Sequence, residues 1–289
     1  MKRVLIIGVG GYVGGRFKKY ISNYPDFEIS EVSSLDREWE SVSFEGFDAV
    51  YNVSGLAHAN ARQGTEEQYY EVNGRLPIEL ALKAKSEGVK LFIQMSSMIV
   101  YGDMSHIGKA KMITHDTIPS QPTIYGKSKM MAENGLHELE DESFQVAILR
   151  PPLIYSEDAR DNFPRLVMFA KKSPICPKLV NHQSMIYVDN LCELVRLIIM
   201  NNKGGTYFPQ QKEYIQTSMI VEDISKASGN RIIMTKLFNP LLRVLSMFIP
   251  FIRKAFGNIT YDKAMSSHFD WNYIVVDYAT SIKRITGKK

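Results

Sequence analysis

Apolar residues along this 289-residue chain follow two alternating patterns. Short, almost unbroken apolar runs predict strands at 2–8, 27–33, 47–53, 90–96 and 145–150. Apolar positions at helical spacing predict helices near 12–22, 66–87 and 123–140. Strands that alternate with helices form a parallel sheet with helices on its faces. The pattern therefore predicts an α/β fold built on a doubly wound parallel sheet.

The first strand runs directly into a glycine-rich loop, whose residues are Gly8, Val9, Gly10, Gly11, Tyr12, Val13 and Gly14. Gly8 can make the tight turn, Gly11 lets the backbone approach a pyrophosphate, and Gly14 permits close packing of the next helix. The amides of that helix then face the phosphates, which predicts a Rossmann-type dinucleotide site. The spacing differs from the common G-x-G-x-x-G, and a glycine-rich turn without a ligand is the alternative.

A second motif, Y-x-x-x-K, is formed by Tyr125 and Lys129. Four residues apart on a helix, the two side chains project from one face. The ammonium stabilises a phenolate and lowers the pKa of the tyrosine towards working pH. The motif therefore predicts a proton-transfer pair, and a half-buried helix tyrosine is the alternative.

Further motifs occur in a set order around this pair. They are the segment 53–57 (Val-Ser-Gly-Leu-Ala), Asn73, Ser97 four residues before Tyr101 in Val-Tyr-Gly, and the segment 149–152 (Leu-Arg-Pro-Pro). With these motifs the chain resembles, over nearly its whole length, the extended short-chain dehydrogenase/reductase superfamily, which includes the NAD-dependent epimerases and dehydratases. Within it the chain is most similar to bacterial UDP-N-acetyl-sugar 4-ketoreductases and to UDP-glucose/galactose 4-epimerase-like enzymes of polysaccharide synthesis.

The resemblance implies a catalytic triad of Ser97, Tyr125 and Lys129. Tyr125 would exchange a proton with a sugar oxygen that Ser97 also binds, and Lys129 would hold the nicotinamide ribose. The expected cofactor-binding residues are Gly8, Gly11, Tyr12, Val13, Gly14, Ser33, Ser34, Arg37, Val53, Ser54, Gly55, Asn73, Tyr125, Lys129 and Pro152. The resemblance implies no metal.

The residues after Ser97 narrow the reaction. Dehydratases of this group carry an Asp-Glu pair there, whereas this chain has Met98 and Ile99, which cannot exchange protons. A 4-ketoreductase and an epimerase remain, for a UDP-N-acetyl-hexosamine type of sugar. A UDP-hexose 4-epimerase proper and a non-catalytic dinucleotide-binding sensor or scaffold are the alternatives.

The end of the second strand bears on the choice of cofactor. NAD-specific relatives carry an acidic residue there, and the expected position falls on Ser33, followed by Ser34 and Arg37. Hydroxyls and a guanidinium suit a 2′-phosphate, so NADP(H) is favoured and NAD(H) remains possible. A register shifted by two residues would instead make Glu31 the ribose ligand.

The expected substrate-binding residues are His58, Ser97, Asn162 and Phe163. The resemblance implies a dinucleotide-binding domain over 1–155 and about 182–205, with 156–181 and about 206–289 forming a smaller mixed α/β substrate lobe. Segment 240–256 is apolar with interspersed cations, and packing against this lobe is favoured over peripheral contact with a membrane.

Composition agrees with a globular enzyme, with 45% hydrophobic and 23% charged residues and a formal net charge of +4. This spread charge indicates no nucleic-acid partner. Cys176 and Cys192 have no metal-ligand spacing, and no secretory signal or ~20-residue apolar run is present, so a cytoplasmic protein is expected. By resemblance, the helices at 66–87 and 123–140 are expected to form a homodimer.

Overall fold

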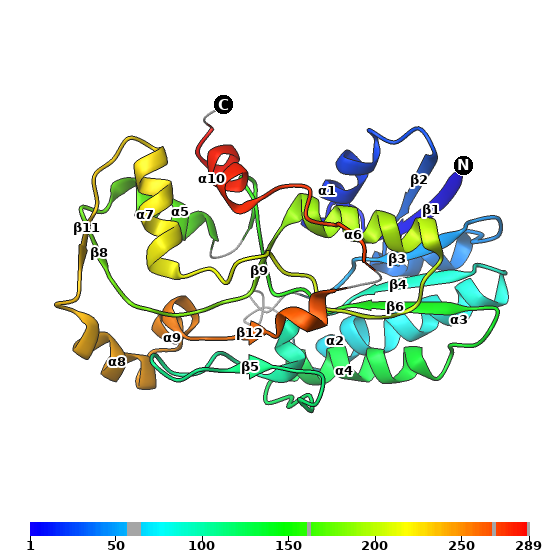
Figure 1. Ribbon diagram of the computed structural model, residues 1–289. Helices are drawn as coiled ribbons and strands as arrows, with labels where there is room; N and C mark the ends of the chain where they lie inside the picture. Colours follow the sequence, from blue (N-terminus) through cyan, green and yellow to red (C-terminus); the bar gives the residue numbers. More distant parts are fainter. Residues whose placement is uncertain (57–64, 161–162, 268–269, 288–289) are drawn as a thin grey trace.

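The computed structural model describes residues 1–56, 65–160, 163–267 and 270–287. Its larger lobe is built on a parallel sheet of six strands in the order β10-β6-β4-β3-β1-β2 (Figure 1). The strands are β1 (Lys2–Ile7), β2 (Phe27–Val32), β3 (Ala49–Asn52), β4 (Leu91–Met95), β6 (Gln145–Leu149) and β10 (Gly205–Tyr207). The predicted α/β fold with a Rossmann-type parallel sheet is confirmed.

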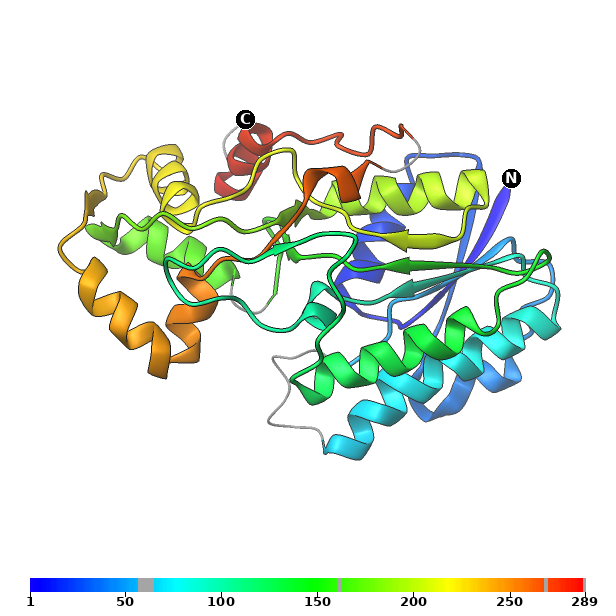
Figure 2. The same ribbon diagram turned by 60° about the horizontal axis from the view of Figure 1, so that its bottom comes forward.

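Helices cover both faces of this sheet. Alternate residues of β1 point to opposite faces: Val4 and Ile6 pack with α1 (Tyr12–Ile21) and α6 (Val188–Asn201). Leu5 and Ile7 pack with α3 (Leu76–Ser86) and α4 (Ile124–His137) on the other face, as Figures 1 and 2 show. The strand order reverses between β1 and β3, so their carboxyl ends mark the crevice where such sheets bind ligands.

The smaller lobe lies beyond the carboxyl ends of the sheet (Figure 1). It contains the parallel pairs β7 (Leu153–Tyr155) with β9 (Met185–Tyr187), and β8 (Ile175–Pro177) with β11 (Ile233–Thr235). Its core is closed by α5 (Phe163–Lys172), α7 (Thr217–Ala227) and α10 (Tyr278–Thr286). The pair β5 (Met112–Ile113) with β12 (Thr260–Tyr261) joins the segment before α4 to this lobe.

Three elements differ from the pattern-based expectation. The single helix expected at 66–87 consists of α2 (Glu66–Tyr70), a π-helical turn at Glu71–Arg75, and α3. The segment at about 182–205, expected in the dinucleotide-binding domain, begins with β9, which pairs with β7 outside the six-stranded sheet. The main sheet gains a sixth strand, β10, which pairs with β6 after the chain returns through α6.

The expected packing of segment 240–256 against the smaller lobe is wrong for most of its side chains. The segment forms α8 (Asn239–Phe248) and α9 (Pro250–Phe256), and its one buried side chain in α8 is Ser246. Leu241 is 56% exposed and Phe248 75% exposed. Within the described ranges, no helix is long and apolar enough to cross a bilayer.

Candidate functional site

The glycine-rich loop has the geometry that a dinucleotide site needs. Gly8 has φ +120°, and a Cβ there would lie 3.0 Å from Ser54 N, so only glycine fits this turn. A Cβ on Gly14 would lie 2.9 Å from Val53 Cγ2, which explains how α1 packs so close to β3. Gly11 precedes α1 and places no side-chain cap on its first amides. These amides are the groups that bind phosphate at a helix N-terminus, so the loop fits a pyrophosphate.

The residues expected at the adenosine ribose follow β2 directly. Val32 is the last residue of β2 and accepts a hydrogen bond from Gly8 N at 3.0 Å, so Ser33 comes next beside the glycine loop. Glu31, the alternative ribose ligand, forms an ion pair with Lys18 on α1. Arg37 pairs with Glu40 at 2.5 Å and with Glu79 at 2.8 Å, and its side chain is 49% exposed.

Asn73 fixes the loop that follows β3. Its fully buried amide accepts a hydrogen bond from Leu56 N at 2.9 Å and donates one to Leu56 O at 3.1 Å. A Cβ on Gly55 would lie 2.8 Å from Asn73 Oδ1 and 3.2 Å from Lys129 Nζ, so this position admits only glycine without rearrangement. The loop therefore runs directly beside the catalytic lysine of the expected triad.

Lys129 lies on the inner face of α4 and is only 4% exposed. Its Nζ donates a hydrogen bond of 2.9 Å to Met95 O at the end of β4. Burial lowers the pKa of Lys129 to about 8, and the Glu133 carboxylate opposes this shift. The lysine is therefore held at the carboxyl end of the central sheet. Met95, which it bonds, lies two residues before Ser97 in the chain.

Tyr125 and Ser97 lie on adjoining elements. Tyr125 is half-buried in the first turn of α4, and its ring lies edge-on to Tyr69 at a centroid distance of 6.3 Å. Ser97 begins the short helix η4 (Met98–Tyr101), where its hydroxyl accepts a hydrogen bond from Ile99 N at 3.3 Å. The two elements are in close contact, because a Cβ on Gly126 would lie 3.3 Å from Ile99 O.

A buried ionic network that the sequence did not indicate supports this arrangement. Arg150, from the expected Leu-Arg-Pro-Pro motif, donates to Glu133 of α4 at 2.5 and 3.0 Å and to the Tyr101 hydroxyl at 2.6 Å. Ser96 donates a short hydrogen bond to the same Glu133 carboxylate. The network ties α4, η4 and the ends of β4 and β6 together. One feature of the sequence could have indicated the network: Glu133 lies one helical turn after Lys129 and so on the same buried face of α4.

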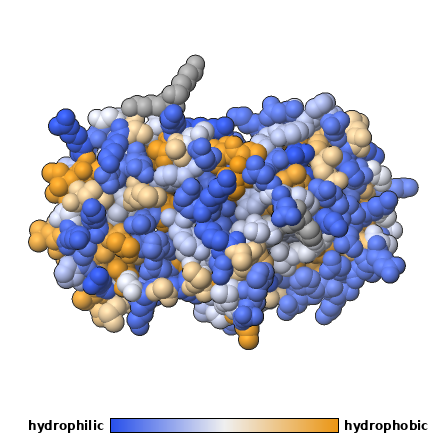
Figure 3. Space-filling model, in the orientation of Figure 1, coloured by the Kyte–Doolittle hydropathy of each residue, from blue (hydrophilic) through white to orange (hydrophobic). Residues whose placement is uncertain are grey.

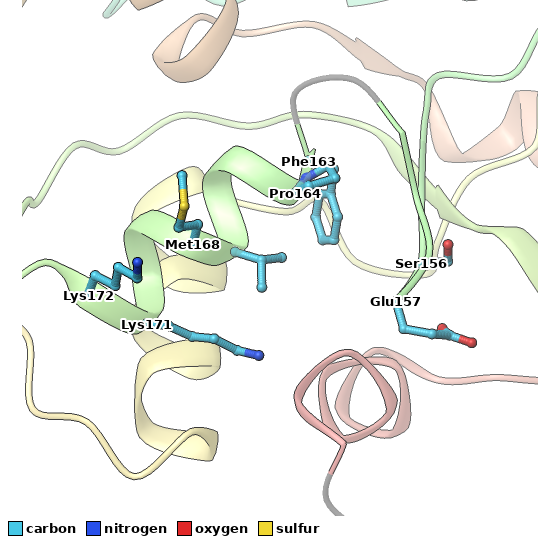
Figure 4. Close-up of a pocket in the computed structure, with 8 residues that line it drawn as sticks. Ser156, Glu157, Phe163, Pro164, Met168, Lys171 and Lys172 are labelled. Atoms are coloured by element: carbon cyan, nitrogen blue, oxygen red, sulfur yellow. The ribbon is translucent and has the colours of Figure 1, made fainter.

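On the substrate side, Phe163 is buried at the start of α5 and its ring packs against Tyr155 at 5.4 Å. It borders a cavity of about 270 Å³ that Ser156, Glu157, Val167 and Met168 also line (Figure 4). Ser156 also shares a hydrogen bond with Tyr12 of the cofactor loop. His58 and Asn162 lie outside the described residues. Pro152, expected among the cofactor-binding residues, is buried between β6 and β7.

His182 and Gln183 precede β9 and have different environments. Gln183 is 2% exposed, and its side-chain amide donates to Gly257 O at 3.1 Å and Ala255 O at 3.2 Å. His182 is exposed. Gln183 therefore holds the chain after α9 in place.

The sheet, the glycine loop and the buried lysine describe a nicotinamide-dependent enzyme, and comparison with known proteins agrees. Residues 4–208 match the model of the NAD dependent epimerase/dehydratase family, so the chain belongs to this family of enzymes. It is 26% identical to UDP-glucose 4-epimerase of Vibrio cholerae, over 78% of this chain and 76% of that protein. It is 27% identical to N-acetyl-alpha-D-glucosaminyl-diphospho-ditrans,octacis-undecaprenol 4-epimerase of Escherichia coli O157:H7, over 82% of this chain and 76% of that protein.

Solved structures show the same fold at lower identity. A dTDP-4-dehydrorhamnose reductase from Clostridium acetobutylicum has a TM-score of 0.75 at 18% identity, covering 99% of this chain and 98% of that one. UDP-glucuronic acid 4-epimerase from Bacillus cereus, in complex with NAD, has a TM-score of 0.74 at 15% identity, covering 99% and 97%. A human epimerase family protein with NADPH has a TM-score of 0.76 at 13% identity, covering 99% and 100%.

Proposed function

We propose that this protein is an NAD(P)-dependent 4-ketoreductase or 4-epimerase of a nucleotide sugar, of the UDP-N-acetyl-hexosamine type used for polysaccharide or O-antigen precursors. The observation that carries the proposal is the placement of Lys129. Its buried ammonium lies beside the Val53–Leu56 loop, one helical turn from Tyr125. The ammonium is bonded to the carbonyl of Met95, which is two residues before Ser97.

The three residues of this group have different roles. Tyr125 transfers a proton to or from the sugar oxygen at C4, and Ser97 donates a hydrogen bond to the same oxygen. Lys129 holds the ribose hydroxyls next to the nicotinamide and stabilises the Tyr125 phenolate through its charge. The bound nicotinamide supplies or accepts the hydride, and the protein contributes position and electrostatics. Neither Met98 nor Ile99 has an exchangeable side-chain proton, so no side chain there supports elimination of water.

NADP(H) is the cofactor that we propose. The Glu31 carboxylate is engaged by Lys18, and the position after the end of β2 holds the uncharged Ser33. A serine there leaves room for the 2′-phosphate, whereas a carboxylate would repel it. The relatives named above are known with either cofactor, since the Bacillus structure holds NAD and the human one NADPH.

A second candidate substrate carries the same sugar on a lipid diphosphate. One relative is named for an undecaprenol-linked N-acetylglucosaminyl diphosphate. The exposed apolar helix α8 of this chain favours this candidate, because a lipid-linked substrate is met only at a membrane surface.

The proposal is tested with the purified chain and both reaction types. Oxidation of NADPH with a 4-keto UDP-N-acetyl-hexosamine would identify a reductase, and interconversion of UDP-N-acetylglucosamine with its C4 epimer would identify an epimerase. Native mass spectrometry adds an independent readout, because an epimerase recycles and retains its cofactor whereas a reductase exchanges it.

Tyr125→Phe should lower turnover by at least about 100-fold, with cofactor affinity nearly unchanged, because only the proton donor is lost. Tyr24→Phe removes the same hydroxyl from a residue remote from the site and is the matched control. Full activity of Tyr125→Phe, or no turnover of either the nucleotide-linked or the lipid-linked sugar, would refute the proposal.

A further inference from the structure

The far end of the smaller lobe carries an unusual concentration of exposed apolar side chains. It is formed by residues 164–180 and 229–256, which include β8, β11, α8 and α9, and is called the distal surface below. These two segments hold 13 of the 23 large apolar side chains that the described residues expose. Figure 3 shows such side chains gathered at the end of the molecule where Figure 1 places β8, β11 and α8.

The two segments form one continuous surface. Ile175 and Ile233 are partners in the β8–β11 pair, and Asn239 at the start of α8 donates a hydrogen bond of 2.9 Å to Lys178 O. Exposed apolar positions recur along α8 at Leu241, Val244, Met247 and Phe248, with Leu237 before the helix and Phe251 in α9. Each of these side chains is between 55% and 78% exposed. One stripe of the helix therefore faces away from the lobe.

Positive charge is also concentrated in the distal surface. The distal surface segments contain nine Lys and Arg residues and no Asp or Glu. The rest of the chain has the remaining 26 of the 35 cations against all 31 acidic residues. Among these cations Lys171, Lys172, Lys236 and Arg243 are exposed, whereas Arg253 pairs with Asp103 at 2.9 Å. A protein with a net charge of only +4 thus has one strongly basic end.

We propose that the distal surface docks the protein peripherally on an anionic lipid bilayer. An apolar stripe flanked by cations inserts at the depth of the headgroups, and the cations bind the acidic lipids. A helix of 10 residues is about 15 Å long, half the thickness of the hydrocarbon core, so α8 lies in the surface. A second copy of the chain is a poorer partner, because a two-fold interface would bring the exposed cations Lys171, Lys172, Lys236 and Arg243 of the two copies together.

Flotation of the full chain with lipid vesicles tests the proposal. At low salt the protein should float with vesicles of phosphatidylglycerol and phosphatidylcholine, and should stay in solution with phosphatidylcholine alone. The double variant Lys236→Glu/Arg243→Glu should bind at least about 25-fold more weakly, from about fivefold per cation. Lys19→Glu/Lys90→Glu reverses two exposed cations at remote positions and is the matched control, with binding unchanged.

The apolar stripe is tested separately with Val244→Glu/Phe248→Glu, which should lower vesicle binding at least about tenfold. Met200→Glu, at an exposed methionine of α6, should leave it unchanged. None of these changes lies in the catalytic group, so turnover of a soluble nucleotide sugar stays normal whether or not the proposed reaction is the true one. Absence of flotation at low salt, or equal losses in the controls, would overturn the proposal. So would an α8-dependent dimer that binds no vesicles.

Discussion

Lys129 combines full burial with an ionisable group. Its pKa is lowered to about 8 from the ordinary 10.5, because burial penalises the ammonium. The unfolded chain keeps this proton up to about pH 10.4, so between about pH 8 and 10.4 the unfolded state binds more protons than the folded state. The stability contributed by this group therefore rises with pH across that window, and below about pH 8 its burial has its full cost of about 3 kcal/mol.

Lys129→Met should remove this pH dependence. The variant should gain folding stability relative to the parent, and this gain should be about 2 kcal/mol larger near pH 7 than near pH 9.5. Urea unfolding of both proteins at the two pH values measures it. Lys127→Met, two residues earlier on the exposed face of α4, is the control and should show no such difference. A gap that is the same at both pH values would contradict the argument.

Ser33 should decide between the two nicotinamide cofactors. The unmodified protein is expected to bind NADPH more tightly than NADH, and Ser33→Asp should weaken NADPH binding by at least about tenfold through repulsion of the 2′-phosphate. Fluorescence titration with each cofactor measures both affinities. Ser33→Asn is the uncharged control, and Glu31→Gln should leave the preference unchanged. Tighter binding of NADH by the parent would favour Glu31 as the ribose ligand.

The sequence could predict the residues that belong to short motifs. Gly8 makes the tight turn and Gly14 allows the close helix packing that were expected of them, because both roles depend on the local backbone. The contacts between Ser96, Glu133 and Arg150 could not be predicted in the same way. They join three segments that only the finished sheet brings together.

At the scale of elements, α4 is held in register by the buried pair of Glu133 and Arg150. Glu133→Gln would leave the Arg150 guanidinium buried without its counter-charge, and should destabilise the protein by about 3–5 kcal/mol. Urea unfolding measures this loss. Glu138→Gln, at the exposed end of the same helix, is the matched control.

A double variant separates charge from packing at this site. Glu133→Gln/Arg150→Met should recover part of the lost stability, since both buried charges are then absent. Turnover of the double variant should be low, because Arg150 also bonds the hydroxyl of Tyr101, the last residue of η4. If Glu133→Gln were as stable as the parent, α4 would not depend on this pair.

Hydrophobic periodicity predicted the strands and main helices of the larger lobe well, because these elements are buried on one or both faces. It could not show the π-helical turn at Glu71–Arg75, where one extra residue per turn directs Asn73 inwards. It also could not show that the apolar stripe of α8 stays exposed. An apolar stripe has the same pattern whether a core or another surface covers it.

At the scale of the whole molecule, Arg16 links the two lobes. This residue of α1 bonds Glu157 at 3.0 Å and Asp158 at 3.1 Å in the segment after β7, and Asp189 at 2.8 Å at the start of α6. The carboxyl ends of β7 and β9 thus meet the helix that follows the cofactor loop. A movement of the smaller lobe would therefore shift α1, the helix that follows the glycine-rich loop.

Assembly is the remaining property of the whole molecule. The helices expected to pair across a two-fold axis are α2–α3 and α4, which lie side by side on the outer face of the sheet (Figures 1 and 2). Of their apolar positions Val72, Leu76, Leu80, Leu82, Met130, Met131 and Leu136, the structure buries Leu76, Leu80 and Leu136 beneath the helices. Val72 and Met130 are partly exposed but also pack against buried clusters, so Leu82, 50% exposed, and the partly exposed Met131 are the positions left for a partner.

We therefore predict a homodimer through α3 and α4. Light scattering at micromolar concentration should give about twice the chain mass of 32.9 kDa. Leu82→Glu should shift the protein towards the monomer, because a two-fold interface would bring the new carboxylate against an apolar partner surface. Val244→Glu, on α8 at the other end of the molecule, should leave the mass unchanged and so separates this interface from the distal surface. A parent protein that is monomeric and fully active would refute the dimer, while the roles assigned to Ser97, Tyr125 and Lys129 would still stand.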